Sequence, residues 1–327
     1  MKNTWKAGIT LMCLAALACG GSDDEPMDPN GGDTGAATAI AAASGDAQRI
    51  AAGVQLLAPL VARVTNADND PVSGERVTWT VTAGGGSVSQ SSTTTGSDGT
   101  TSVTLTTGSA GGTNTVTATV DGLSGSPVTF TANAVTPSAV AVAAGNNQMA
   151  RVDQPLASPV EVRVTAGDGG PVPGATVSWS VTSGSGSPSS MSTVTDDDGR
   201  TSVSWTLGSN TGGNSITASA GSVESTASAN GTQPVTVTVN MQGIAFVAPG
   251  GGDDVTIMLG DTVRWVNLDA VNHTATSTAV PTGGDGFGSG QFGNGGEFSF
   301  VANVRGMWTY FCEVHPATMV GALITVQ

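Results

Sequence analysis

The chain of 327 residues contains only two histidines and three cysteines. Two histidines are too few for a zinc hydrolase centre with three histidine ligands, for a multicopper oxidase or for a nitrite reductase with two copper sites. Two of the cysteines, Cys13 and Cys19, lie near the N-terminus, which leaves almost no room for disulfide bonds. These shortages limit the chain to at most one small metal centre.

Charged residues are also scarce, at 11% of the chain, whereas glycine is abundant, with 47 residues. This composition is typical of neither a helical bundle nor a charged coil, and the hydrophobic content of 38% is enough for small cores. The formal net charge of −15 argues against binding to nucleic acid. The length predicts two or three domains rather than one.

The N-terminus has the pattern of an export signal. Lys2 and Lys6 are followed by the apolar residues 7–18, a run too short to span a bilayer. The run ends in Ala-Leu-Ala before Cys19 and resembles a bacterial lipoprotein signal, which implies cleavage after residue 18 and acylation of the Cys19 thiol. An ordinary secretory signal is the alternative. We expect an exported cell-envelope lipoprotein, held by its lipid in the outer membrane of a Gram-negative host and facing the periplasm or the surface.

Residues 19–35 are acidic and rich in glycine and proline, which predicts a disordered tether. Loss of the signal peptide removes both lysines and no acidic residue, so the mature chain is more negative still. Cys312 is then the one free thiol in an oxidising compartment, with no partner in the chain. A bound metal is the simplest occupant of such a thiol.

The chain next repeats itself with a period of 100 residues. From about residue 45 to residue 118 the two copies align without a gap, so that Trp79 matches Trp179 and Asp98 matches Asp198. Apolar residues alternate with threonine or serine around each tryptophan, which predicts a strand with one buried face and a tryptophan in the core. Two copies of one all-β folding unit are therefore expected.

Both copies resemble the invasin/intimin type of bacterial Ig-like repeat, in stretches such as PVSGERVTWTV and GSDGTTSVTLTTG. We assign residues 36–134 to the first Ig-like repeat and residues 135–233 to the second. The resemblance implies β-sandwiches that act mostly as spacers or adhesion stalks. A rigid spacer is our first interpretation, and direct adhesion is the second.

A different pattern fills residues 234–327. The glycine-rich residues 282–296 predict a long loop, and strands are predicted at 235–240, 254–258, 261–267, 272–277, 296–301, 306–312 and 319–326. Trp265 and Trp308 are expected in the core, and Phe287 and Phe298 are expected to pack inward. The segment therefore predicts a third sandwich, and the whole chain an all-β protein.

This third segment holds the residues with metal-binding chemistry. Both histidines, His273 and His315, occur here together with Cys312, and Met319 follows closely. One thiolate, two imidazoles and one thioether form the ligand set of a type 1, or blue, copper site, in which the methionine is the weak axial ligand. Zinc is the alternative occupant, although a thioether offers it little. Asp269 and Glu313 are interpreted as solvated charges rather than ligands.

The segment resembles a cupredoxin of the plastocyanin/pseudoazurin/amicyanin group. The resemblance is carried by GDTVRWVN at 260–267, by Asn272-His273-Thr274, by FGSG at 287–290, and by Phe298, Gly306 and Tyr310 before the cysteine. It implies a cupredoxin Greek-key β-sandwich that binds one copper per chain through His273, Cys312, His315 and axial Met319.

Two features depart from that family's pattern. Three residues separate His315 from Met319, where plastocyanin has four and amicyanin two. Thr274 stands where several family members have asparagine, and we expect its hydroxyl to hydrogen-bond the cysteine loop instead.

The first functional hypothesis is a membrane-tethered carrier of single electrons, with the Ig-like pair as its spacer. The acidic surface favours a basic redox partner protein. Copper sequestration or delivery without electron transfer is one alternative, and a surface adhesin that uses the third domain as a binding tip is another. An enzyme is not expected, because no histidine is left to act as a general base and no nucleophile motif is present.

Overall fold

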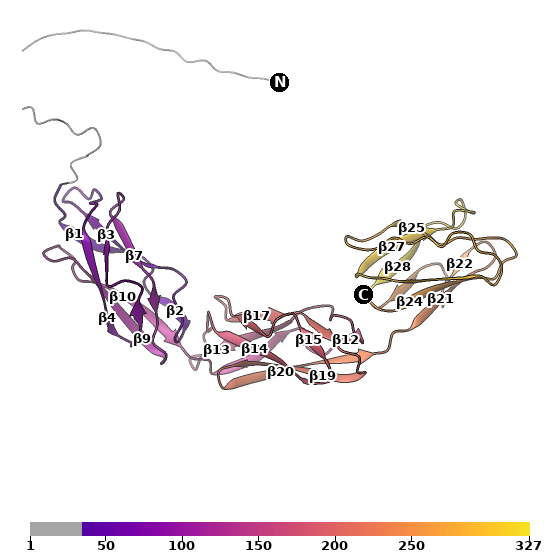
Figure 1. The fold of residues 1–327 in the computed structure, drawn as a ribbon, viewed down its shortest axis with the longest axis horizontal. Coiled ribbons are helices and arrows are strands. Elements are labelled where there is room, and N and C mark those ends of the chain that lie inside the picture. The colour runs from indigo at the N-terminus through magenta and orange to yellow at the C-terminus, as the bar shows by residue number, and fades with distance from the viewer. Residues whose placement is uncertain (1–34) are drawn as a thin grey trace, which may run out of the picture.

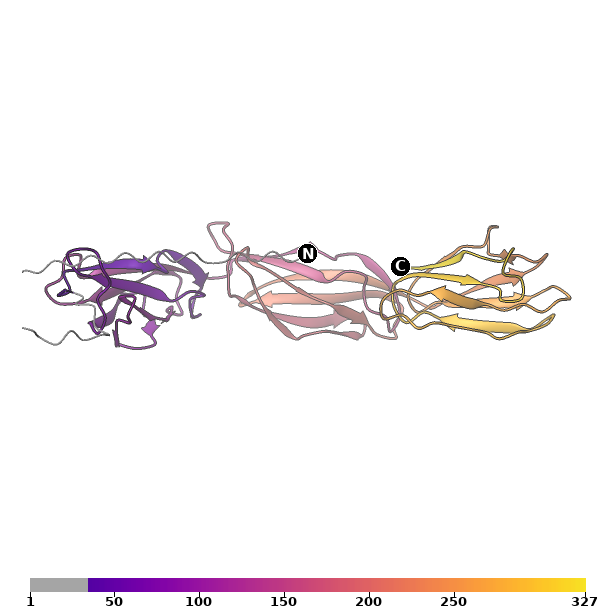
Figure 2. The same cartoon turned by 90° about the horizontal axis from the view of Figure 1, so that it is seen from above.

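The computed structural model describes residues 35–327. They form three β-sandwiches that follow one another along the long axis of the molecule, indigo to yellow in the views of Figure 1 and Figure 2. No α-helix occurs within the described residues, so the predicted all-β class is confirmed. No helix in this part of the chain is long and apolar enough to cross a membrane. The signal peptide, Cys19 and the tether up to residue 34 lie outside the described residues.

The first repeat packs a three-stranded sheet, β1-β3-β7, against a five-stranded sheet, β2-β10-β9-β4-β6, with the small pair β5-β8 at the side. Its strands are β1 (Ala39–Ser44), β2 (Gln48–Ala51), β3 (Leu60–Thr65), β4 (Arg76–Ala83), β5 (Ser87–Val88), β6 (Ser92–Thr94), β7 (Thr100–Val103), β8 (Leu105–Thr106), β9 (Gly112–Thr119) and β10 (Val128–Val135).

The second repeat has the same arrangement, with sheets β11-β13-β17 and β12-β20-β19-β14-β16 and the pair β15-β18. Its strands are β11 (Ala139–Ala144), β12 (Gln148–Arg151), β13 (Val160–Thr165), β14 (Thr176–Ser183), β15 (Gly186–Pro188), β16 (Ser192–Val194), β17 (Arg200–Val203), β18 (Trp205–Leu207), β19 (Gly212–Ala220) and β20 (Val223–Thr232). The repeated sequence therefore gives a repeated fold.

Each repeat is built around its predicted tryptophan. Trp79 in β4 and Trp179 in β14 are each 2% exposed, which confirms both as core residues. The indole N–H of Trp79 donates to the Thr93 hydroxyl at 2.7 Å, and Trp179 repeats this bond with Thr193 at 2.8 Å. The buried polar atom is thereby satisfied, so the large ring stabilises the core without an unpaired donor.

The third domain is a sandwich of two four-stranded sheets, β22-β21-β24-β26 and β23-β28-β27-β25. Its strands are β21 (Thr236–Met241), β22 (Phe246–Val247), β23 (Val255–Ile257), β24 (Thr262–Asn267), β25 (Thr276–Ala279), β26 (Glu297–Val301), β27 (Gly306–Phe311) and β28 (Ala322–Val326). Trp265 and Trp308 are fully buried in its core and Phe287 nearly so, while Phe298 packs against the core half-buried, as predicted.

The strand predicted at 272–277 is wrong in its position, because β25 begins only at Thr276. The preceding residues make a single bridge, His273 to Phe292, instead of a ladder. The short strand β22 has no counterpart among the predicted strands. Both differences lie in loops at one end of the sandwich, where tertiary contacts override the local pattern.

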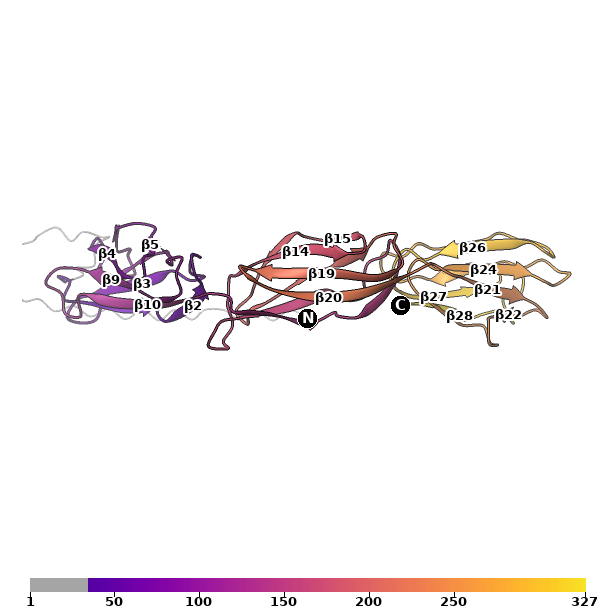
Figure 3. The ribbon, with the colours of Figure 1, turned by 90° about the horizontal axis from the view of Figure 1, so that it is seen from below.

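Strand direction places that end at the tip of the molecule. Strands β21 and β24 run parallel in one sheet. Strand β27 of the other sheet runs in the same direction, since it starts next to Arg305, which bonds to Pro155 of the second repeat. Strands β24 and β27 end at the loops that carry His273 and Cys312, and β21 ends beside the first of these loops, where the Met241 carbonyl accepts the N–H of Leu268. Figure 3 shows β21 and β24 pointing away from the second repeat, while the C-terminus lies beside it. The loops with the predicted ligands are therefore remote from both repeats.

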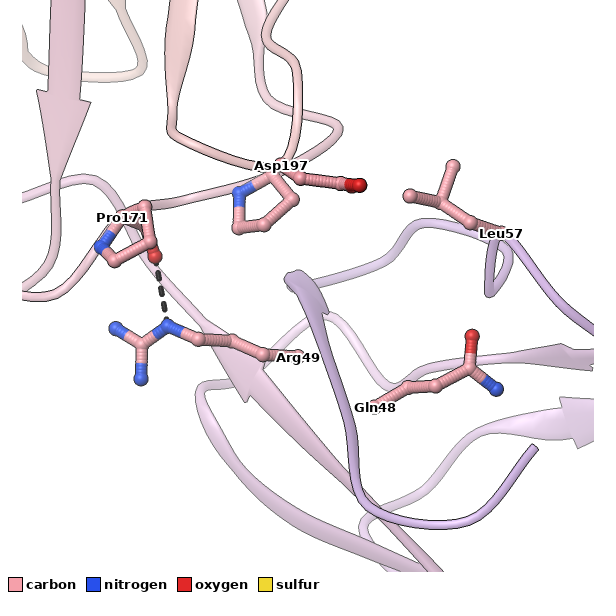
Figure 4. Close-up of a pocket in the computed structure, with 6 residues that line it drawn as sticks. Gln48, Arg49, Leu57, Pro171 and Asp197 are labelled. Carbon is pink, nitrogen blue, oxygen red and sulfur yellow. Dashed lines mark hydrogen bonds between the residues drawn. The ribbon is translucent and has the colours of Figure 1, made fainter. Parts of the chain in front are cut away.

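The two repeats contact each other through an arginine. Arg49 in β2 donates hydrogen bonds from both of its terminal nitrogens to the Asp168 carboxylate, each at 2.8 Å. Its Nε donates to the carbonyl of Pro171 at 2.7 Å, the bond drawn in Figure 4. The backbone N–H of Ala51 donates to the carbonyl of Pro173 at 2.8 Å. A shallow pocket of about 350 Å³ lies beside these bonds and is lined in part by Leu57. The junction thus combines hydrogen bonds, one ion pair and apolar contact.

Candidate metal centre

The loop between β27 and β28 carries three of the four predicted ligands. Cys312 directly follows β27, and its N–H donates to the carbonyl of Met319 at 2.9 Å. The N–H groups of His315 and Met319 donate back within the loop, to the carbonyls of Cys312 at 3.2 Å and His315 at 3.0 Å. The short spacing of these residues thus closes a compact turn, which gathers their side chains at one end of the sandwich.

His273 comes from a different loop, between β24 and β25. Its backbone exchanges hydrogen bonds with Phe292 at 3.1 and 3.0 Å. The buried amide of Asn267 holds this loop, since it donates to the carbonyls of Val271 at 2.8 Å and Phe292 at 2.9 Å. His273 is itself fully buried. Its ring therefore has a fixed position opposite the cysteine loop.

The structure brings His273, Cys312 and His315 together. The Cys312 Sγ atom lies 3.7 Å from the Nδ1 atom of each histidine. The three ligand atoms all lie within 4.8 Å of one another, and the two imidazole centroids are 4.7 Å apart. Met319 is buried in the same core cluster as Cys312 and bonded to the loop through its backbone. These residues could hold one metal ion.

The donor atoms fit copper by their chemistry. Two imidazole nitrogens and one thiolate converge from two loops, with a thioether residue buried beside them. A thiolate with two imidazoles suits copper or zinc, and the buried thioether residue favours copper, whereas magnesium and calcium require oxygen ligands. Cys312 has no disulfide partner, so its thiol is available as a ligand.

The interpretation of Asp269 as a solvated charge is wrong. Its Oδ2 atom lies 3.0 Å from Nε2 of His273, and its two oxygens accept the N–H groups of Gly243 at 2.8 Å and Ile244 at 2.9 Å. These bonds, from Ile244, Gly243 and His273, lower the pKa of Asp269 below its ordinary value. A carboxylate only accepts, so Nε2 of His273 is the donor in this bond, and Nδ1 is the ring nitrogen that faces Cys312.

Thr274 joins the two ligand loops. Its N–H donates to Cys312 Sγ at 3.3 Å, and its hydroxyl accepts the N–H of Glu313 at 2.8 Å. The predicted hydrogen bond from Thr274 to the cysteine loop is therefore confirmed. Glu313 remains exposed and, in contrast to Asp269, makes no side-chain bond to a ligand.

The three gathered residues differ in their access to solvent. His273 and Cys312 are 0% exposed, whereas His315 is half-buried. Pro316 and Ala317, which follow His315, are exposed. A second molecule can therefore approach the centre at His315.

Comparisons with known proteins bear on the repeats. Residues 40–133 match the family Bacterial Ig-like domain (group 1), so the first repeat is a domain of this type. The solved D0-D1 domain of intimin is similar at 18% identity over 59% of this chain and 95% of that one, with a TM-score of 0.26. The adhesin InvE of Yersinia pseudotuberculosis is similar at 20% identity, covering 62% of each chain, with a TM-score of 0.30. No curated protein sequence matches.

A further similarity concerns a smaller part of the chain. Amicyanin from Paracoccus versutus matches at 27% identity over 28% of this chain and 81% of that chain, with a TM-score of 0.25. The metal centre is defined by the geometry of its own residues.

Proposed function

We propose that the third domain is a type 1 copper centre that passes single electrons between proteins of the bacterial cell envelope. The convergence of His273, Cys312 and His315, each of the two histidines 3.7 Å from the thiol, is the observation that carries this proposal. A bound copper ion would supply one-electron chemistry by alternating between Cu(II) and Cu(I). The protein side chains would hold the ion in one arrangement in both states.

His315 is the proposed exit for the electron, because the other three candidate ligands are buried. The loops around it expose apolar side chains, at Ile244, Leu268, Val271, Val314 and Val320. An apolar rim of this kind favours docking of a partner protein over the histidine edge. The acidic chain would steer a basic partner toward this encounter.

The rest of the chain would serve as a spacer. In this proposal Cys19 carries the lipid, residues 19–35 form the tether and the two repeats hold the third domain away from the membrane. The strand directions support the arrangement, since they carry the ligand loops away from the repeats. The protein would then act as a carrier and not as an enzyme.

Electrochemistry of the full chain loaded with copper separates this function from copper sequestration. An electron carrier should give a reversible one-electron couple and fast electron self-exchange, because the ligands are already gathered before the ion binds. The Cys312→Ser variant should lose both properties. Tight binding without a reversible couple would instead support sequestration or delivery.

Adhesion is a second candidate function, favoured by the bacterial Ig-like match at residues 40–133. In this case the third domain would be a binding tip that needs no metal. Attachment of cells that display the chain to host or abiotic surfaces tests it. Loss of attachment on deletion of residues 234–327, with no loss in Cys312→Ser, would support adhesion against electron transfer.

A further inference from the structure

The contact between the second repeat and the third domain is built around one buried carboxylate. Asp261, in the turn before β24, is 1% exposed, and its oxygens accept the N–H groups of Val235 at 2.8 Å and Met258 at 3.0 Å. Arg151, the last residue of β12, donates from Nη2 to Oδ2 of Asp261 at 2.9 Å, and its Nε lies 2.7 Å from Oδ1. Arg151 also donates to the Thr232 hydroxyl at 2.8 Å. The carboxylate thus faces an arginine from a different domain.

A second arginine crosses the same junction in the opposite direction. Arg305, in the loop before β27, donates from Nη2 to the carbonyl of Pro155 at 2.6 Å. Gly260 lies against Gln154 so closely that a Cβ atom at Gly260 would be 2.9 Å from the Gln154 Cγ atom. Gln154 and Pro155 of the second repeat are therefore held between the turn at Asp261 and Arg305.

The two repeats differ at the positions that face their downstream neighbours. In the second repeat, β12 and β20 pair Arg151 with Thr232 at this end. The equivalent pair of the first repeat, in β2 and β10, is Ala51 and Val135. Both of these are buried in the core cluster of the second repeat. At this pair of positions the first repeat thus offers two apolar side chains to the second repeat, whereas the second repeat offers an arginine and a threonine to the third domain.

We propose that Arg151–Asp261 and Arg305–Pro155 form an interdomain clamp, which holds the third domain on the second repeat in one orientation. Domains joined in one chain move relative to each other by default, unless their interface prevents it. Here, opening the junction would separate Arg151 from a carboxylate that is buried and already bonded to its own backbone. This contact is a charge-assisted hydrogen bond, which is about twice as strong as a bond between neutral groups, so it favours the closed junction.

The clamp gives the metal-binding tip a fixed direction. Strands β24 and β27 begin beside the clamp and end at the ligand loops, so the orientation of the clamp sets the orientation of these loops. The clamp would therefore present His315 away from the repeats at all times. This last step rests on the proposed function, whereas the clamp itself needs no metal.

Residual dipolar couplings of backbone amides in the full chain, measured without metal, test the clamp. We expect the second repeat and the third domain to fit a single alignment tensor. The double variant Arg151→Met/Arg305→Met should lose the single-tensor fit, and the third domain should show a smaller spread of couplings. Unchanged amide shifts away from the junction would show that both domains remain folded.

Arg200→Met is the matched control, because Arg200 pairs with Glu161 inside the second repeat and does not reach the third domain. It should keep the single tensor. Two tensors in the wild-type chain, or one tensor in the double variant, would overturn the clamp, and the wild-type result decides even if the double variant fails to fold. Because the measurement uses the metal-free protein, a failure of copper binding leaves its outcome unaffected.

Discussion

At the scale of single residues, the metal centre combines four candidate ligands with neighbouring side chains that hold them in place. His273, Cys312 and His315 stand out because the segment has no other histidine or cysteine, and Met319 stands out because no other methionine lies in the cysteine loop. The hydrogen bond from His273 to Asp269 could not be predicted, because it forms only when the loop between β24 and β25 folds. This fold brings the Asp269 carboxylate to 3.0 Å from Nε2 of His273. An aspartate four residues before a ligand is the only signal that the sequence offers.

Replacing Asp269 by alanine should weaken metal binding by about 10- to 100-fold, the usual effect of removing a carboxylate that orients a ligating histidine. The change removes the acceptor that fixes the His273 ring and its tautomer. Competition with a Cu(I) chelator measures the affinity. Glu313→Gln, which changes a neighbouring acid without a bond to either histidine, should bind as the wild type does. Equal losses of metal affinity in both variants would mean that the effect comes from the loss of negative charge near the site and not from the hydrogen bond to His273.

Thr274→Val should destabilise the metal-free chain by about 1 kcal/mol, the net contribution of one typical hydrogen bond. Valine keeps the shape of threonine but cannot accept the N–H of Glu313. Thr274→Ser keeps the hydroxyl and should recover most of the loss. Urea unfolding followed by tryptophan fluorescence gives the comparison, and equal stability of the wild type and Thr274→Val would contradict the role assigned to this hydroxyl.

At the scale of strands and junctions, prediction depended on local pattern. The strands predicted at 261–267, 296–301 and 306–312 nearly coincide with β24, β26 and β27, because each alternates regularly. The strand predicted at 272–277 lies too early in the chain, because its first residues serve the ligand site and pair at only one bridge. The interdomain bonds carry no local signal at all, since Arg151 and Asp261 are 110 residues apart.

The junction between the two repeats should depend on pH only in strong acid. The Arg49 side chain, with the N–H of Gly170, lowers the pKa of Asp168 from 3.8 to about 2. A carboxyl whose pKa is lowered in the folded state stabilises that state above the ordinary pKa, and the contribution is lost as pH falls toward the lowered value. Because the Arg49–Asp168 pair is exposed, its contribution to the stability of the junction is modest.

Small-angle X-ray scattering from pH 6 down to pH 2 measures this dependence. The angle between the repeats should stay constant to about pH 4 and broaden only below it, in the range set by the pKa of Asp168. Asp168→Asn should give the broader distribution at every pH. A change of shape near pH 6 would have to come from another group.

At the scale of the whole molecule, one chain combines two kinds of sandwich for different purposes. The repeats bury tryptophan cores, hold no gathered set of metal ligands among the described residues, and contact their neighbours end to end. The third domain places its ligand loops at the far end from the repeats. A redox centre at the tip of a stalk, fixed in direction by the clamp, is the account that unites these features.

Visible absorption and electron paramagnetic resonance of the full chain loaded with Cu(II) test the central claim most directly. The account predicts an intense blue band from charge transfer between the Cys312 thiolate and copper, a narrow hyperfine splitting, and the loss of both in Cys312→Ser. A colourless protein, or one with only the weak spectrum of ordinary Cu(II), would contradict the electron-transfer function and leave the third domain as a binding tip on an Ig-like stalk.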